Sequence, residues 1–329
     1  MTSKRRKFLV VGGAGYIGSH MVRELVRGNH DVVILDNLST GNRKLVKEGE
    51  FIHGNLGDVD LLNRLFSAHA IDGVMHFAAF SQVGESVAQP LKYYHNNLAE
   101  TMNLVDAMLR HGVKRFIFSS TAAVYGEPEA VPITESHPCR PTNPYGNTKL
   151  AVERMLADCE AAYGLQYMIL RYFNAAGADD SGEIGEMHDP ETHLIPLVLK
   201  AAAGRIDHIQ VFGTDYPTTD GTCIRDYIHV NDLARAHMLA FDALAQGAAS
   251  TVYNLGSSTG YSVKAVIEKA ESVTGRKIPV IEGPRRAGDP ATLVASSQKI
   301  QRELGWSPMY GDLETIIRTA WHWQSKSAG

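Results

Sequence analysis

A glycine-rich turn near the start of the chain is the feature that most restricts its fold. The apolar run Phe8–Val11 leads into Gly12–Gly18, of sequence GGAGYIG, and a helical pattern over 16–28 follows. Glycines at this spacing let a chain turn tightly after a strand and let backbone N–H groups approach a pyrophosphate at a helix N-terminus. The strand before the turn and the helix after it make the motif specific. We therefore predict a dinucleotide-binding βαβ unit.

An acidic residue at the end of the second apolar run discriminates between dinucleotides. Asp36 follows Val32–Leu35 and stands 18 residues after Gly18. A carboxylate at this position accepts hydrogen bonds from the adenosine ribose hydroxyls and repels a 2′-phosphate. The predicted cofactor is therefore NAD rather than NADP.

Short apolar runs alternate with helical patterns through the first half of the chain. This alternation predicts a Rossmann-type, doubly wound parallel sheet in an α/β protein. The expected strands are Phe8–Val11, Val32–Leu35, Phe51–His53, Gly73–Phe77, Arg115–Phe118 and Gln166–Arg171. The expected helices cover roughly 16–28, 58–69, 90–111 and 144–163. We predict that residues 1–174 form an NAD-binding domain that also carries the catalytic residues.

The pattern loosens after Asn174, because Gly and Asp are frequent over 177–189. Helices are expected near 192–203, 230–246, 262–274 and 311–324, with strands near 209–212, 224–228 and 252–255. We predict a smaller α/β substrate-binding lobe over 175–329, with some segments returning to the Rossmann domain.

Charge and cysteine usage exclude several classes of partner. The net charge of −4 shows no excess of basic residues, which proteins that bind nucleic acid or an anionic membrane usually have. The three cysteines have no metal-like spacing and indicate reduced thiols in a cytoplasmic protein. No apolar run approaches the 18 or so residues of a membrane span. We expect no metal, nucleic-acid or membrane site.

A tyrosine and a lysine four residues apart are the candidate catalytic pair. Tyr145 and Lys149 share one face of the helix expected over 144–163. An ammonium beside a phenol favours the phenolate, which is the form that a general base needs. Thr121 adds a hydroxyl after the expected strand Arg115–Phe118, at the sheet edge where ligands bind in open α/β sheets. Each feature alone is common, but together with the dinucleotide unit they indicate hydride chemistry on a nicotinamide.

These residues together resemble the extended short-chain dehydrogenase/reductase family, and the resemblance runs nearly end to end. The matching segments are Gly12–His20, Asp36–Leu38, Val83–Ser86, Tyr145–Lys149, Arg171–Asn174, Gly221–Val230 and Arg285–Asp289. Several of these segments match one subfamily rather than the fold in general.

The resemblance implies an isomerase in which NAD stays tightly bound and no net redox change occurs. It implies interconversion of UDP-glucose and UDP-galactose at C4, through a transient 4-keto sugar, in galactose metabolism. Tyr145 would take the proton of the C4 hydroxyl while hydride passes from C4 to NAD⁺. Lys149 would lower the pKa of Tyr145 and hold the nicotinamide ribose. Thr121 would bond the C4 oxygen or mediate the proton transfer.

The resemblance also implies two sets of binding residues. The cofactor set is Gly12, Gly15, Tyr16, Ile17, Gly18, Asp36, Asn37, Asn55, Leu56, Phe77, Ala78, Ala79, Asn96, Ser119, Tyr145, Lys149 and Tyr172. The substrate set is Thr121, Asn174, His193, Leu194, Phe212, Arg225, Arg286, Asp289 and Leu293. Three members depart from the commonest family pattern: Thr121 replaces Ser, Asn55 replaces Asp and His193 replaces Asn.

Other activities stay open at this point. Leu293 stands at the position that gates N-acetylated sugars in the family, and its intermediate size leaves a UDP-N-acetylglucosamine 4-epimerase or a bifunctional enzyme as an alternative. A nucleotide-sugar 4,6-dehydratase is less favoured, because Ala122 and Ala123 replace an Asp-Glu pair and cannot transfer protons. A non-enzymatic NAD sensor would not need both Tyr145 and Lys149. The resemblance further implies a homodimer that pairs the helices over 90–111 and 144–163.

Overall fold

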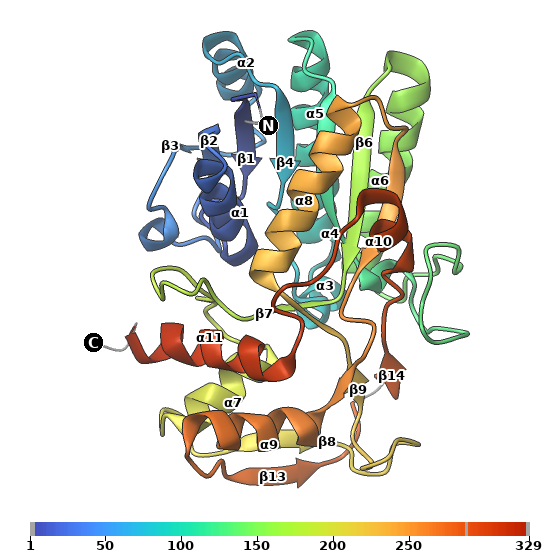
Figure 1. Cartoon of the computed structure of the whole chain (residues 1–329). Helices are drawn as coiled ribbons and strands as arrows, with labels where there is room; N and C mark the ends of the chain where they lie inside the picture. Colours follow the sequence, from blue (N-terminus) through green and yellow to red (C-terminus); the bar gives the residue numbers. More distant parts are fainter. Residues whose placement is uncertain (1–3, 287–288, 327–329) are drawn as a thin grey trace. The chain divides into compact units, whose positions relative to one another are not determined.

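The computed structural model describes residues 4–286 and 289–326, which divide into two compact units (Figure 1). The first unit comprises the chain up to Glu127 together with Pro138–Tyr172 and Ala234–Tyr253. The second comprises Pro128–His137, Phe173–Leu233 and the chain from Asn254 onward. The main change of unit follows Tyr172, two residues before the end of the predicted NAD-binding domain.

A seven-stranded sheet forms the centre of the first unit. The strand order is β11-β6-β5-β4-β1-β2-β3, and strands β1 to β6 pair in parallel. This doubly wound arrangement confirms the predicted fold class. The strands are β1 Lys7–Val11, β2 Asp31–Asp36, β3 Glu50–His53, β4 Gly73–His76, β5 Arg115–Thr121, β6 Gln166–Tyr172 and β11 Thr251–Leu255. The order reverses between β1 and β4, and ligands bind at such switch points beyond the carboxyl ends of the strands.

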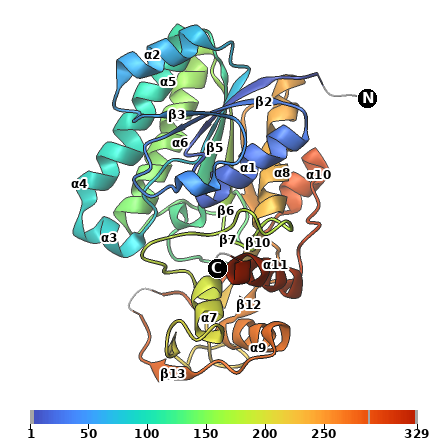
Figure 2. The ribbon, with the colours of Figure 1, turned by 90° about the vertical axis from the view of Figure 1, so that its left-hand side faces the viewer.

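Helices cover both faces of this sheet, so the central strands are buried and mostly apolar (Figure 2). On one face lie α2 Val59–Ala68, α5 Glu100–Arg110 and α6 Pro144–Tyr163, whose leucines, valines and Phe66 pack against the sheet in one core. On the other face lie α1 Tyr16–Arg27 and α8 Val230–Ala245. The ring of Phe241 in α8 packs edge-on against Phe8 of β1, with centroids 4.6 Å apart.

The helix that carries the candidate catalytic pair has the predicted bounds. Asn143 caps its start by accepting a hydrogen bond from the Gly146 N–H, and Pro144 occupies its first turn. Gly164 ends it with a left-handed φ of 67°. These local signals are visible in the sequence, which is why α6 could be predicted to the residue.

The second unit is built from short strands and three packed helices. The helices α7 Leu194–Ala202, α9 Val263–Thr274 and α11 Leu313–Lys326 share one apolar core. The strands pair as β10-β7, β12-β9-β14 and β13-β8. Their bounds are β7 Asn174–Ala176, β8 Ile209–Phe212, β9 Ile224–Arg225, β10 Tyr227–His229, β12 Tyr261–Ser262, β13 Val280–Gly283 and β14 Thr292–Leu293, and α10 spans Gln298–Leu304.

Two predicted elements differ in detail from the structure. The helix expected over 90–111 is present as one unbroken helical stretch, in which a π-helical segment, Tyr94–Ala99, joins α4 Pro90–Tyr93 to α5, and α3 Val83–Ala88 precedes it. The strand expected over 224–228 is two strands, β9 and β10, which join different sheets. Strand pairing in the folded protein thus overrides the continuous local pattern over 224–228.

Within residues 4–286 and 289–326, no helix combines the length and apolar character needed to span a bilayer.

Candidate active site

The glycine turn between β1 and α1 has a geometry that side chains would not allow. Gly12 has a φ of 79°, and a Cβ on it would lie 2.5 Å from the backbone N of Ala78. A Cβ on Gly18 would lie 2.1 Å from the carbonyl oxygen of Gly12. Gly12 therefore permits the turn beside the end of β4, and Gly18 permits α1 to start close to it.

Asp36 lies at the carboxyl end of β2 with its carboxylate held in place by the backbone. It accepts hydrogen bonds from the N–H groups of Ala14 (2.9 Å) and Leu38 (2.8 Å). Burial raises the pKa of Asp36, and these two hydrogen bonds oppose the rise. The carboxylate is thus oriented beside the glycine turn before any ligand arrives.

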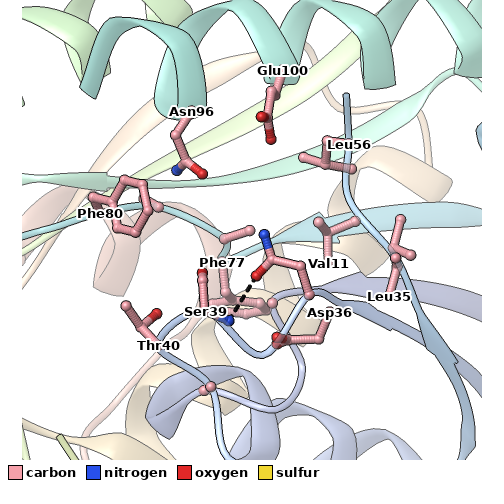
Figure 3. A pocket seen from close by; sticks show the side chains of 17 residues that line it. Val11, Leu35, Asp36, Ser39, Thr40, Leu56, Phe77, Phe80, Asn96 and Glu100 are labelled. Atoms are coloured by element: carbon pink, nitrogen blue, oxygen red, sulfur yellow. Dashed lines mark hydrogen bonds between the residues drawn. The ribbon is translucent and has the colours of Figure 1, made fainter. Parts of the chain in front are cut away.

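A pocket opens where the glycine turn, the ends of β2 and β4, and the helical segment containing Asn96 and Glu100 meet (Figure 3). Asn96 and Glu100 lie on one side of it, and Asp36 and Thr40 lie on the other. Nine of the predicted cofactor residues line it: Gly12, Gly15, Asp36, Asn37, Leu56, Phe77, Ala78, Ala79 and Asn96. The pocket also has lining residues that the sequence analysis missed: Val11, Leu35, Ser39, Thr40, Gly41, Gly54, Phe80 and Glu100.

The missed residues carried a weak sequence signal. Ser39, Thr40 and Gly41 form a small polar loop directly after Asp36, where a strand end should approach a ligand. Glu100 could be found only from the structure, because α5 brings it to the pocket. Asn55, a member of the predicted cofactor set, is not among the lining residues; its side-chain oxygen accepts a hydrogen bond from the Gly57 N–H at 2.5 Å.

Thr121 and Tyr145 lie close enough for a side-chain hydrogen bond, although they come from β5 and α6. Burial raises the pKa of Tyr145, and the hydrogen bond with Thr121 opposes the rise. The Thr121 hydroxyl also accepts a hydrogen bond from the Ala123 N–H at 3.1 Å. The predicted pair of hydroxyls is therefore assembled at the carboxyl edge of the sheet.

Lys149 is buried one turn further along α6. Its ammonium donates to the Ser119 carbonyl at 2.9 Å and lies 4.8 Å from the ring centroid of Phe118. Burial lowers the pKa of Lys149 to about 7, and the Glu153 carboxylate opposes the fall. The expectation that Lys149 lowers the pKa of Tyr145 is not met in this structure, because burial dominates the tyrosine and the ammonium points to the Ser119 carbonyl.

The buried ion pair between Glu153 and Arg171 stabilises the end of β5 that carries Thr121. The Glu153 carboxylate accepts hydrogen bonds from Ser120 (2.5 Å) and from Nε of Arg171 (2.9 Å). Arg171 also donates to the Tyr125 hydroxyl at 3.0 Å. The network links α6, β5 and β6, so it fixes the positions of the two elements that carry Thr121 and Tyr145.

The remaining predicted cofactor residues of this unit lie next to the catalytic residues or in the first turn of α1. Ser119 Oγ lies 3.2 Å from Nε2 of His237 and also hydrogen-bonds Tyr172, whose pKa is raised chiefly by burial. Tyr16 is buried and packs edge-on against His20, and Ile17 is half-buried. None of Tyr16, Ile17 and Gly18 is among the residues that line the pocket.

The two arginines of the predicted substrate set lie in the second unit and already have partners there. Arg225 forms an ion pair with Asp289, which belongs to the same predicted set. The Arg286 guanidinium stacks on Phe212, 3.9 Å from the ring centroid. Ala287 and Gly288, which complete the predicted motif, lie outside the described residues.

The other predicted substrate residues of this unit are also placed. Asn174 starts β7 and donates its side-chain amide to the Asp226 carbonyl at 2.7 Å. Leu293 lies in β14, in register with Arg225 of β9. Leu194 opens α7, and His193 directly before it lies 2.7 Å from Glu186 Oε1. Burial alone would lower the pKa of His193, but Glu186 and Glu191 raise it to about 10.

The sequence model of the NAD dependent epimerase/dehydratase family matches residues 8–256. The chain therefore belongs to this family. The match covers the glycine turn, the Thr121–Tyr145–Lys149 constellation and most of the predicted substrate residues, so the expected family resemblance is confirmed.

Individual relatives are similar over nearly the whole chain. A UDP-glucose 4-epimerase of Halalkalibacterium halodurans is 55% identical over 318 residues, covering 97% of this chain and 95% of the relative. The crystal structure of UDP-glucose 4-epimerase from Brucella ovis in complex with NAD is 50% identical, with a TM-score of 0.95 and coverage of 97% and 98%. The enzyme from Bifidobacterium longum, solved with NAD⁺ and UDP, is 40% identical, with a TM-score of 0.92 and coverage of 98% and 99%.

Proposed function

We propose that this chain is an NAD-dependent UDP-glucose 4-epimerase that interconverts UDP-glucose and UDP-galactose and serves galactose metabolism. The observation that carries the proposal is the meeting of Thr121 and Tyr145, with Lys149 one turn away, in a chain 55% identical to a UDP-glucose 4-epimerase. The reaction is an isomerisation, so each hydride that leaves the sugar must return to it.

The residues of the first unit fit a dinucleotide. Gly12 and Gly15 leave backbone exposed in the pocket, and Asp36 presents an oriented carboxylate at the end of β2. When bound, NAD supplies the acceptor and donor of hydride at C4 of the sugar. Lys149, fixed by Ser119, would hold the nicotinamide ribose, as the resemblance implies.

Tyr145 performs the proton transfer. In its ionised form Tyr145 would take the proton of the C4 hydroxyl as C4 is oxidised to the ketone. Because burial raises the pKa of Tyr145 in the ligand-free protein, ionisation requires a positive charge near the phenol when the ligands are bound. Thr121, hydrogen-bonded to Tyr145, orients the C4 oxygen or passes the proton. In the return step Tyr145 would give the proton back to the C4 oxygen.

The second unit supplies the groups that hold the UDP part of the substrate. Guanidinium groups bind paired phosphate oxygens in bidentate fashion, which suits Arg225 and Arg286 to a pyrophosphate. Arg225 would exchange Asp289 for a phosphate, which frees the Asp289 carboxylate for ribose hydroxyls. Asn174, His193, Leu194, Phe212 and Leu293 complete the proposed set.

Incubation of the purified protein with UDP-galactose, without added cofactor, tests the proposal. Formation of UDP-glucose would support both the epimerase and a tightly held NAD. If no product forms even with NAD supplied, the chain acts on another nucleotide sugar.

The proposal extends to a cytoplasmic homodimer. Large apolar side chains are exposed along α3, α4 and α5, namely Val87, Leu91 and Met102, with Leu91 71% exposed. Leu91 and Met102 lie in the 90–111 region predicted to pair across a two-fold axis. In the described part of the chain Cys139, Cys159 and Cys223 form no disulfide, which is usual in a reducing compartment. Light scattering should give twice the chain mass, and Leu91→Glu should give the single-chain mass.

A further inference from the structure

The loop between β7 and α7 carries two Glu-x-His pairs in the second unit. The pairs are Glu186-Met187-His188 and Glu191-Thr192-His193. One ligand atom from each of these four Glu and His residues lies within 4.8 Å of all the others. Within residues 4–286 and 289–326, no second group of three or more such residues converges in this way.

The four side chains direct their ligand atoms toward one another. Nδ1 of His188 lies 3.0 Å from Glu186 and 3.8 Å from Glu191. Nδ1 of His193 lies 2.7 Å from Glu186 and 3.1 Å from Glu191. Ligands at about 2.0–2.2 Å from a tetrahedral zinc ion are about 3.4 Å from one another, which lies within the range of these separations.

Burial and charge favour a cation at this place. The side chains of Glu186 and Glu191 are only 7% and 3% exposed, and within the described part of the chain neither pairs with a lysine or arginine. Without a metal the two buried carboxylates have the imidazoles as their partners, and they raise the pKa of His193 to about 10. A metal ion would displace the proton that His193 then holds, because an imidazole binds a metal in its neutral form. A divalent cation with this set of ligands forms a neutral site.

The loop is held in this shape from outside the cluster. The indole N–H of Trp323 in α11 donates to the Glu186 carbonyl at 3.0 Å. A Cβ on Gly185 would lie 2.3 Å from the Trp323 ring, so that the loop can approach α11 only with glycine there. Lys326 of the same helix donates to the Ser181 carbonyl at 2.8 Å. Ligands supported in this way need less ordering when a metal binds.

We propose that Glu186, His188, Glu191 and His193 form a binding site for a divalent transition metal ion of the zinc class. Two imidazole nitrogens and two carboxylate oxygens match the ligand types and four-coordinate geometry that zinc takes in proteins. Access for the ion comes through the two histidines, whose side chains are 32% and 49% exposed. The ion would hold His193 directly before α7, beside the proposed substrate residue Leu194.

Zinc stoichiometry of the purified protein tests the site without reference to epimerase activity. After treatment with a chelator, titration with Zn²⁺ alone in a calorimeter should show one ion bound per chain. Glu186→Gln keeps the side-chain shape but removes a proposed ligand. Loss of a residue that only hydrogen-bonds a ligand weakens metal binding about 10–100-fold, so Glu186→Gln should weaken zinc binding by at least as much. His188→Ala should do the same, and His208→Ala, at an exposed histidine of the same unit, should bind zinc like the parent.

Cobalt distinguishes this site from the three cysteines. Co²⁺ bound to nitrogen and oxygen ligands gives visible bands without the near-ultraviolet thiolate charge-transfer band. Absence of stoichiometric zinc, equal binding in all variants, or a thiolate band that disappears when the cysteines are alkylated would each overturn the site. The Glu186→Gln and His188→Ala variants are assessed by their metal content and not by epimerase activity. The outcome therefore does not affect the epimerase proposal, which the UDP-galactose assay tests separately.

Discussion

The charged residues around the proposed catalytic pair and those proposed to bind phosphate are held in different ways in the two units. In the first unit, Lys149, Glu153 and Arg171 are all less than a tenth exposed, and each is hydrogen-bonded to a neighbouring element. In the second, Arg286 is exposed and stacks on Phe212, and Arg225 pairs with an acidic residue that could also bind a ligand. The comparison teaches that orientation for the chemistry is built into the fold of the first unit. The second unit can exchange its partners when a charged ligand binds.

Loss of the proposed base should have the largest effect. Tyr145→Phe keeps the ring but removes the phenolate, so epimerisation should fall about 10²–10⁴-fold while NAD stays bound. Tyr163→Phe, at an exposed tyrosine near the end of the same helix, should retain the parental rate. Steady-state rates and NAD content together measure this, and near-parental turnover in Tyr145→Phe would remove it from the mechanism.

The buried ion pair of the first unit and an exposed ion pair of the second should differ in their contribution to stability. Glu153→Gln leaves the buried Arg171 charge without its counter-ion and should lower the free energy of unfolding by about 3–5 kcal/mol. Glu314→Gln breaks the exposed pair with Lys269 in the second unit and should lower the free energy of unfolding by only about 0–1 kcal/mol. Denaturant titration measures both. Equal costs would contradict the view that burial makes the Glu153–Arg171 pair a fixed part of the first unit.

Buried His76 should make the first unit sensitive to acid. Burial, aided by the charge of Lys149, lowers the pKa of His76 to about 3. The unfolded chain takes up a proton near pH 6.5, so between pH 6.5 and 3 the unfolded state binds more protons and stability falls as the pH falls. His76→Gln should remove up to about 1.4 kcal/mol of this loss per pH unit.

The control for this pH dependence is the exposed His208 of the second unit. Thermal unfolding of His76→Gln and His208→Gln should be compared between pH 5 and 8. The profile of His208→Gln should follow that of the parent. An unchanged profile in His76→Gln would show that His76 is protonated in the folded protein.

A substitution at Leu293 in the second unit should change which sugars are accepted. Of the predicted changes it should have the smallest effect on the conversion of UDP-galactose. Leu293→Tyr places a larger side chain beside Arg225, at the proposed gate for N-acetylated sugars. Any turnover of UDP-N-acetylglucosamine should disappear, while turnover of UDP-galactose changes little. If N-acetylated turnover survives, the gate lies elsewhere.

Local signals made much of the first unit predictable. The glycine turn, Asp36 and the bounds of α6 depend on contacts between near neighbours, such as the Asn143 cap and the left-handed Gly164. The parallel sheet follows from strand–helix alternation, and the edge at which its ligands bind follows from the strand direction. Hence Thr121 and Tyr145 could be named as partners although 24 residues separate them.

Contacts between distant segments decided the rest. The π-helical segment at Tyr94–Ala99, the separation of β9 from β10 and the position of Glu100 in the pocket each depend on packing that local periodicity does not encode. The pKa of Tyr145 rises because burial opposes its ionisation, and burial is a property of the folded chain.

The sequence by itself therefore determined the fold class, the dinucleotide turn and the residue types of the chemistry, because each depends on short-range backbone preferences and on strand direction. Only the tertiary structure decided which charges are buried and which side chains converge. Glu186, His188, Glu191 and His193 illustrate this, because two short Glu-x-His pairs are unremarkable along the chain. They become a candidate metal site only in the folded protein, where the loop that carries them is hydrogen-bonded to α11. Electrostatic free energy depends on distance and burial in space, and neither quantity exists until the chain has folded.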